Sequence, residues 1–119
     1  MPEYGNTVQL IPAGTVVPAA GIQGRTLSPL NKATLRAVVD VTAVSGTTPG
    51  ATVTIETSFD AGATDPWRTV GSFGAITAVT GATPARKSFT GVDRYVRATV
   101  AVAGTNTPTV TLGVSGELV

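Results

Sequence analysis

The chain of 119 residues contains no histidine and no cysteine. These absences exclude disulfides and thiolate chemistry, and they remove the commonest zinc ligands and the commonest general base. Charged residues make up 13% of the chain, about half the usual share, and the formal net charge is +1. Because no basic field is present to hold phosphates, we expect no nucleic-acid partner. We also expect no enzymatic activity, no cofactor and no metal site.

Long hydrophobic runs and helical periods are missing as well. No apolar stretch approaches the length of a membrane span, so we expect no membrane partner. The first residues, MPEYGNTVQLIPAG, lack the basic region and the long apolar core of a secretion signal. The chain is instead rich in threonine, valine, alanine and glycine. Threonine and valine are stiff at χ1 and fit a pleated surface better than a helix, which indicates an all-β protein.

Apolar and polar residues alternate with a period of two from Ala33 onward, which is typical of half-buried strands. Four runs show this alternation: ATLRAVVDVTAV, ATVTIETSF, RYVRATVAVAG and TVTLGVSGELV. The residues predicted to face the core are Leu35, Ala37, Val39, Val41, Ala43, Val53, Ile55, Thr57, Val96, Ala98, Val100, Val102, Val110, Leu112, Val114 and Leu118.

Turn residues separate these runs. SGTTPG follows the first run, so the first two runs are expected to form an antiparallel hairpin, and TNTP is expected to turn the chain before the last run. Shorter strands are predicted in WRTVGSF, AITAVTGATPA and RKSFTGV. Seven to eight strands at roughly ten-residue spacing predict a single antiparallel β-sandwich, either immunoglobulin-like or jelly-roll-like.

The first thirty residues differ from the rest because prolines and glycines recur while apolar residues remain frequent. Proline excludes a helix here and disfavours long ladder strands. Two interpretations stay open: short strands around Gly14–Val17 and Ile22–Leu27, or an extended arm that lies on another subunit. We predict an extended N-terminal arm over residues 1–14 and the sandwich domain over residues 15–119.

The stretch ETSFDAGATDPWRTVGSF gathers the rare residues of the chain. Asp60 and Asp65 could supply calcium ligands, but an EF-hand loop needs further acids at fixed offsets, and these are missing. We therefore interpret both aspartates as turn formers whose side chains bond nearby backbone amides. For the single tryptophan, Trp67, packing in the core or between the sheets is favoured over a subunit contact or stacking on a sugar.

Charge is concentrated in GVDRYVRATV and just before it. Asp93, Arg94 and Arg97, with Arg86 and Lys87, could form a basic face. Because the count is small and acids lie nearby, we favour a solvated sheet face or the rim of a partner contact over a phosphate site.

Beside this reading, the chain from Leu35 to Glu117 resembles a group of small β-sandwich virion proteins of tailed bacteriophages, which serve as head decoration or minor structural proteins. The similarity covers about 70% of the chain, as strand order and as the phrases VTIETSFD, FTGVDRYVRATV and VSGEL. It implies a capsid decoration protein that is made in the host cytoplasm and binds the major capsid protein on the outer head surface.

Apolar residues of the N-terminal region are the predicted partner contacts, because they have little core of their own if the arm is extended. They are Tyr4, Val8, Leu10, Ile11, Val16 and Val17. Self-association as a dimer or trimer stays open. Two alternative functions remain: a tail or head–tail connector component, and a carbohydrate-binding module in which the Trp67 loop makes a weak glycan contact.

Overall fold

The computed structural model describes residues 7–24 and 34–118, and only the backbone of residues 7, 8 and 118. This part of the chain contains strands and no helix, and none of it could cross a membrane as a helix. The strands are β1 (Thr7–Val17), β2 (Ile22–Gln23), β3 (Thr34–Ser58), β4 (Arg68–Ser72), β5 (Ala85–Thr90) and β6 (Tyr95–Leu118). All of their pairings are antiparallel, as the sequence predicted.

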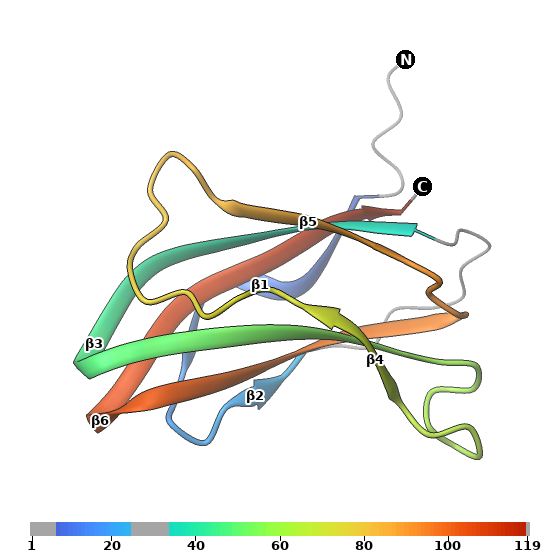
Figure 1. Ribbon diagram of the computed structural model, residues 1–119, viewed down its shortest axis with the longest axis horizontal. Coiled ribbons are helices and arrows are strands. Elements are labelled where there is room, and N and C mark those ends of the chain that lie inside the picture. Colours follow the sequence, from blue (N-terminus) through green and yellow to red (C-terminus); the bar gives the residue numbers. More distant parts are fainter. Residues whose placement is uncertain (1–6, 25–33, 119) are drawn as a thin grey trace.

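The two long strands β3 and β6 form one ribbon that folds over itself. They pair along their whole length, from Leu35 opposite Leu118 to Ser58 opposite Tyr95. Both strands bend sharply in the middle, so that each contributes one half to each of two layers (Figure 1). The predicted hairpin at SGTTPG is therefore wrong, because the segments before and after it pair with β6 rather than with each other.

Close backbone approach at this bend explains its glycines. Gly46 has φ +100°, and a Cβ there would lie 2.7 Å from the Cα of Pro108. Gly104, on the other strand, has φ +127°, and its Cβ would lie 2.9 Å from the carbonyl oxygen of Thr47. Only glycine accepts both conditions at low cost. The turn residues of SGTTPG and TNTP thus make a bend in two paired strands.

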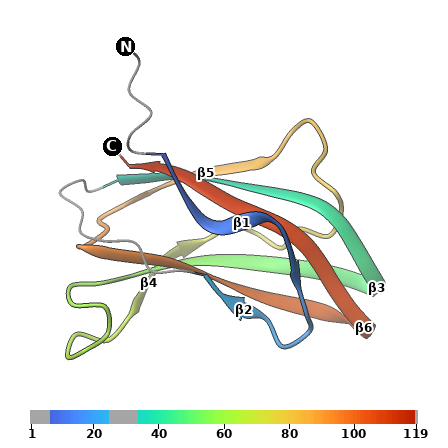
Figure 2. The same ribbon diagram turned by 180° about the vertical axis from the view of Figure 1, so that it is seen from behind.

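The strands form two layers (Figures 1 and 2). The pairings place four segments in each layer. Layer A holds β1, the second half of β6, the first half of β3, and β5, in that order. Layer B holds β2, the first half of β6, the second half of β3, and β4. Counted in chain order, the eight segments pair first with last, second with seventh, third with sixth and fourth with fifth. This nested pairing is a rolled-up ribbon, the jelly-roll arrangement of a β-sandwich.

One hydrophobic core lies between the layers. The rings of Phe73 and Phe89, from opposite layers, meet edge to face with centroids 5.5 Å apart. Each fully buried aliphatic side chain contributes roughly 1.5–3 kcal/mol of hydrophobic free energy. The members of the core predicted from the alternation are Leu35, Ala37, Val39, Val41, Val53, Ile55, Val96, Ala98, Val100, Val110, Leu112 and Val114, with Thr57 buried beside them.

Ala43 was predicted to face the core, but it is exposed. The register shifts between Val41 and Ala43, so that two residues of β3 oppose the single residue Thr111. Such a bulge reverses the alternation. Val44 therefore packs against the core in place of Ala43.

The N-terminal segment is part of the domain from Thr7 onward. β1 pairs with β6 from Thr7 opposite Glu117 to Val17 opposite Val110, as an edge strand of layer A. The predicted boundary after residue 14 therefore does not correspond to a structural boundary. Residues 1–6 of the predicted arm lie outside the described residues, as does the end of the predicted strand Ile22–Leu27, of which β2 is the described part.

A wide bulge lets β1 accommodate its proline and glycine. Three residues, Pro12 to Gly14, stand opposite the single residue Gly113. A Cβ at Gly113 would lie 2.7 Å from the Cα of Ala13, so glycine is required where the bulge crosses β6. Proline is tolerated at this position because it lies in a bulge of an edge strand.

Candidate functional site

The loop between β3 and β4 is closed by its own aspartates. Asp60 accepts hydrogen bonds from the backbone N–H groups of Thr64, at 2.9 Å, and Asp65, at 3.0 Å. Asp65 in turn accepts one from the backbone N–H of Phe59, at 2.8 Å. The predicted role of both aspartates as turn formers is confirmed. Within the described ranges, no cluster of three or more acidic side chains could hold a metal ion.

Hydrogen bonding also sets the ionisation of this loop. The Thr64 hydroxyl and then the Asp65 backbone lower the pKa of Asp60 from 3.8 to about 2. The buried Ser58, which the sequence analysis did not single out, also holds the loop in shape. Its hydroxyl donates to the Asp65 carbonyl at 2.7 Å and accepts from the Gly62 N–H at 2.9 Å. The polar side chains of the loop are therefore engaged in holding its shape.

Trp67 lies on the outer face of layer B, and the prediction that it packs in the core is wrong. The indole is half-buried, and the Arg97 guanidinium stacks over it at 4.2 Å from the ring centroid. Arg97 also donates to Glu56 at 2.7 Å across the β3–β6 pair. Gly62, with φ +83°, lies so close to the indole nitrogen that a Cβ would clash at 2.6 Å. Trp67 therefore covers part of the outer face of layer B and packs against Gly62 of the loop between β3 and β4.

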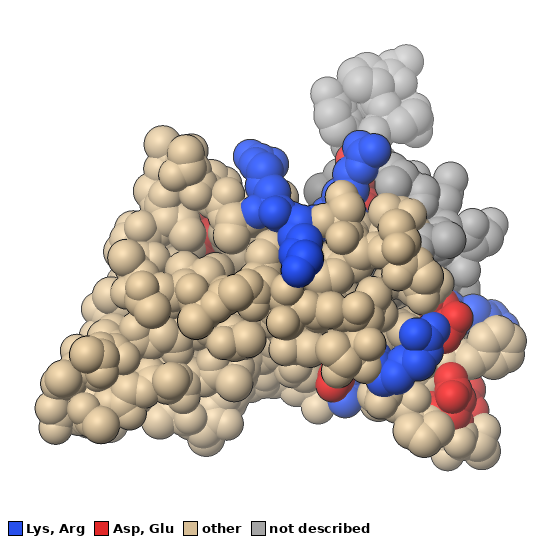
Figure 3. Space-filling model, in the orientation of Figure 1, with Lys and Arg blue, Asp and Glu red and all other residues tan. Residues whose placement is uncertain are grey.

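The basic residues near GVDRYVRATV do not form one face. Arg97 is held by Glu56, while Arg68, from β4, pairs with Asp93 at 2.7 Å. Lys87 points to the open edge between the layers, where its ammonium donates to the Ser72 carbonyl at 2.8 Å. The residues considered for a basic face are thus divided among two layers and one edge, in keeping with the favoured interpretation that they form no phosphate site. In Figure 3 the charged side chains lie over β5 and around β4, and the end that carries the β3 and β6 bends is almost free of them.

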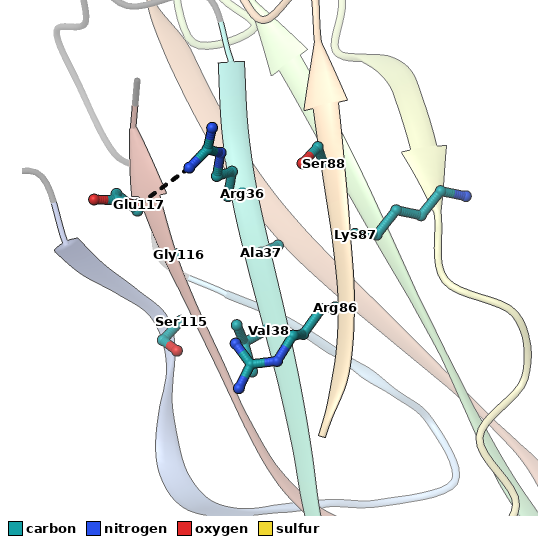
Figure 4. A pocket seen from close by; sticks show the side chains of 9 residues that line it. All are labelled: Arg36, Ala37, Val38, Arg86, Lys87, Ser88, Ser115, Gly116 and Glu117. Atoms are coloured by element: carbon teal, nitrogen blue, oxygen red, sulfur yellow. Dashed lines mark ion pairs between the residues drawn. The ribbon is translucent and has the colours of Figure 1, made fainter. Parts of the chain in front are cut away.

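A hollow of about 390 Å³ lies on the outer face of layer A, over β5, β3 and β6. Val38 and Ser115 lie side by side at its floor, and Arg86 pairs in register with Val38. Figure 4 shows the Arg86 side chain reaching across Val38 toward β6. The residues that line the hollow are Arg36, Ala37, Val38, Arg86, Lys87, Ser88, Ser115, Gly116 and Glu117.

The two arginines of this hollow have few partners of their own. Arg36 meets Glu117 only at 4.0 Å, with the side chains 63% and 48% exposed, so this ion pair contributes little. Arg86 makes no ion pair or side-chain hydrogen bond with any other described residue. The periodicity placed Arg36 on the outer face of its strand, but only the pairing with β5 brings Arg86 beside it.

Three of the six residues predicted to contact a partner are part of the core. Leu10, Ile11 and Val17 are buried, so the premise that they lack a core of their own is wrong. Val16 is 59% exposed and is available for a contact. Tyr4 lies outside the described residues, as does the side chain of Val8.

Neither the comparison with protein-family models nor that with curated proteins finds a match for this chain.

Proposed function

We propose that the protein is a non-enzymatic structural protein of a phage virion, in which it decorates the head by binding the major capsid protein lattice. The observation that carries the proposal is the jelly-roll arrangement of two layers, which hold one hydrophobic core between them and turn two broad outer faces to the surroundings. Folds of this kind recur in viral structural proteins, although a fold alone does not determine a function. The resemblance of the strand order and of VTIETSFD, FTGVDRYVRATV and VSGEL to phage virion proteins adds to this support.

The low charge of the chain suits such a role. Protein–protein interfaces are depleted in charged residues at their centre, because burying an unpaired charge is costly. Much of the surface at the bend of the two long strands is built from uncharged residues, including Ala43, Thr47 and Thr105. Many copies on one shell also provide avidity, so each contact can be weak.

The contact surface in this proposal differs from the one expected from the sequence. Leu10, Ile11 and Val17 are buried in the domain itself, so they do not belong to the contact surface. The exposed Val16 remains, and the outer face of layer A, beside β1, becomes the main candidate.

Counting copies in purified particles tests this proposal. Quantitative mass spectrometry should find the protein in intact particles, at a number comparable to that of the major capsid protein. A number sufficient for only one ring would support the alternative of a tail or head–tail connector. Absence from particles that contain the capsid protein would refute both.

A glycan-binding role is the second candidate, because Trp67 is half-buried on an outer face rather than in the core. Arg97 already occupies one face of its ring, so a sugar could stack only on the other. Titration with a glycan panel tests this role through Trp67 fluorescence, and an unchanged emission throughout would exclude it.

A further inference from the structure

We propose that the hollow on the outer face of layer A binds carboxylate side chains in an acidic segment of a partner protein. This rests on the proposed function only in taking the partner to be a capsid subunit. The starting observation is that three of the four other described cations are engaged. Arg97 pairs with Glu56, Arg68 pairs with Asp93, and the Lys87 ammonium bonds a carbonyl.

Arg36 and Arg86 differ, because both present guanidinium groups around the same hollow without a strong partner of their own (Figure 4). Arg36 lies two residues before Val38 on the same side of β3, and Arg86 is the register partner of Val38 on β5. A guanidinium binds a carboxylate through two parallel N–H donors, which makes arginine well suited to this ligand. Two such groups beside one apolar side chain can hold a carboxylate and the stem that carries it.

Hydroxyl groups complete the lining. Ser88 lies opposite Arg36 in register, and Ser115 lies opposite Val38. Within the described part of the chain, neither serine hydroxyl makes a hydrogen bond. Each hydroxyl can therefore donate to an incoming oxygen. The volume of about 390 Å³ admits one or two side chains.

The charge balance favours a carboxylate over a phosphate. Glu117 lines the same hollow, so the two arginines and this glutamate sum to one positive charge. Lys87 adds little, because its side chain points away from the hollow toward layer B (Figure 4). A singly charged carboxylate matches this field, whereas a phosphate with nearly two charges would be opposed by Glu117. The weak Arg36–Glu117 contact can yield to the incoming group at small cost.

The test is a titration of the isolated protein, followed by NMR, with the capped peptide acetyl-Gly-Glu-Glu-Gly-amide. The glutamine-matched peptide and inorganic phosphate serve as control probes. We expect chemical-shift changes along β3, β5 and the end of β6 with the acidic peptide. Arg86→Gln should weaken binding about tenfold, since a charge-assisted hydrogen bond contributes about that factor. Arg86→Lys should recover only part, because lysine lacks the paired donors.

Arg94→Gln is the matched control. It makes the same change of charge at an exposed arginine that does not line the hollow. Its effect should stay below about twofold, whereas Glu117→Gln should tighten binding about threefold because it removes the competing carboxylate. Equal losses for Arg86→Gln and Arg94→Gln, or no loss for Arg86→Gln, would overturn the proposal. Binding of phosphate without the peptide would also overturn it.

Particle experiments keep this inference separate from the proposed function. The titration needs no capsid, so it tests the hollow even if the protein is absent from particles. If the wild-type protein occupies particles, Arg86→Gln should lower its occupancy, while Arg94→Gln should not. An Arg86→Gln protein that fills particles like the wild type would refute the docking role of the hollow and leave the virion role standing.

Discussion

Replacement of Ile11 by alanine tests whether β1 is an integral strand of the domain. The Ile11 side chain is 1% exposed, in a strand whose proline and glycine made it resemble a loose arm. Truncating a fully buried isoleucine removes its transfer free energy and leaves a cavity, which costs about 2–5 kcal/mol. Because β1 is an edge strand with a bulge beside Ile11, the surroundings can partly collapse. We therefore expect a loss of about 3 kcal/mol.

Val16→Ala is the matched control, because this valine lies on the same strand and is 59% exposed. Its cost should stay within about 0.5 kcal/mol, as is usual for surface substitutions. Stability is measured by equilibrium unfolding in urea, with Trp67 fluorescence as the probe and the denaturant slope compared between variants. A loss of 3 kcal/mol is a large part of the roughly 5–15 kcal/mol that stabilises a domain, so the midpoint should move clearly.

Equal stabilities for the two variants would refute the reasoning, because β1 would then contribute no buried side chain to the core. Truncation provides an independent check. Removal of residues 1–6 leaves every described strand intact, whereas removal of residues 1–14 deletes Leu10, Ile11 and most of β1. The second truncation should therefore unfold or aggregate, in contrast to the folded domain that a free arm would leave.

Three further predictions concern the bend, the loop and the outer face. Gly46→Ala should destabilise the protein by about 1–3 kcal/mol because its φ is positive and its Cβ would meet backbone, while Gly74→Ala, where nothing lies within 4 Å, should be almost neutral in the same unfolding assay. The pKa of Asp60 is lowered to about 2, so its stabilising contribution is complete above pH 4 and disappears as the pH falls through about 2. The stability difference between wild type and Asp60→Asn should accordingly shrink over that interval, and a constant difference would contradict the hydrogen bonds described. Arg97→Ala should cost about 1–2 kcal/mol, because it removes the cation stacked on Trp67 and leaves the half-buried Glu56 without its ion-pair partner. The fluorescence emission of Trp67 should change as well, and an unaltered emission would argue against the stack.

Some features of the site could be read directly from the residues. Asp60 and Asp65 shape their loop through bonds to nearby amides, which is a local property of aspartate in a turn. The hollow of layer A could not be predicted in this way. Arg36 and Arg86 are fifty residues apart, and they become neighbours only through the pairing of β3 with β5.

Trp67 shows the same limit. Its size and rarity favoured the core, since large aromatic side chains gain most from burial. Its actual place depends on Arg97 of β6, whose guanidinium covers the ring on the outer face. No local sequence pattern indicates whether a single aromatic residue will pack in the core or on the outer face of a sheet.

The amino-acid sequence by itself determined the all-β character, the faces of the strands and most of the core, because side-chain alternation is a local property of extended chain. The tertiary structure alone decided which strands pair. SGTTPG carries the residues of a turn, yet β3 stays paired with β6 on both sides of this segment, so SGTTPG forms a bend within a continuous ribbon. Likewise, prolines and glycines indicated an arm, and the bulge opposite Gly113 made it an edge strand with Leu10 and Ile11 inside. Pairing and burial of this kind depend on contacts distant in the chain, which local chemistry does not specify.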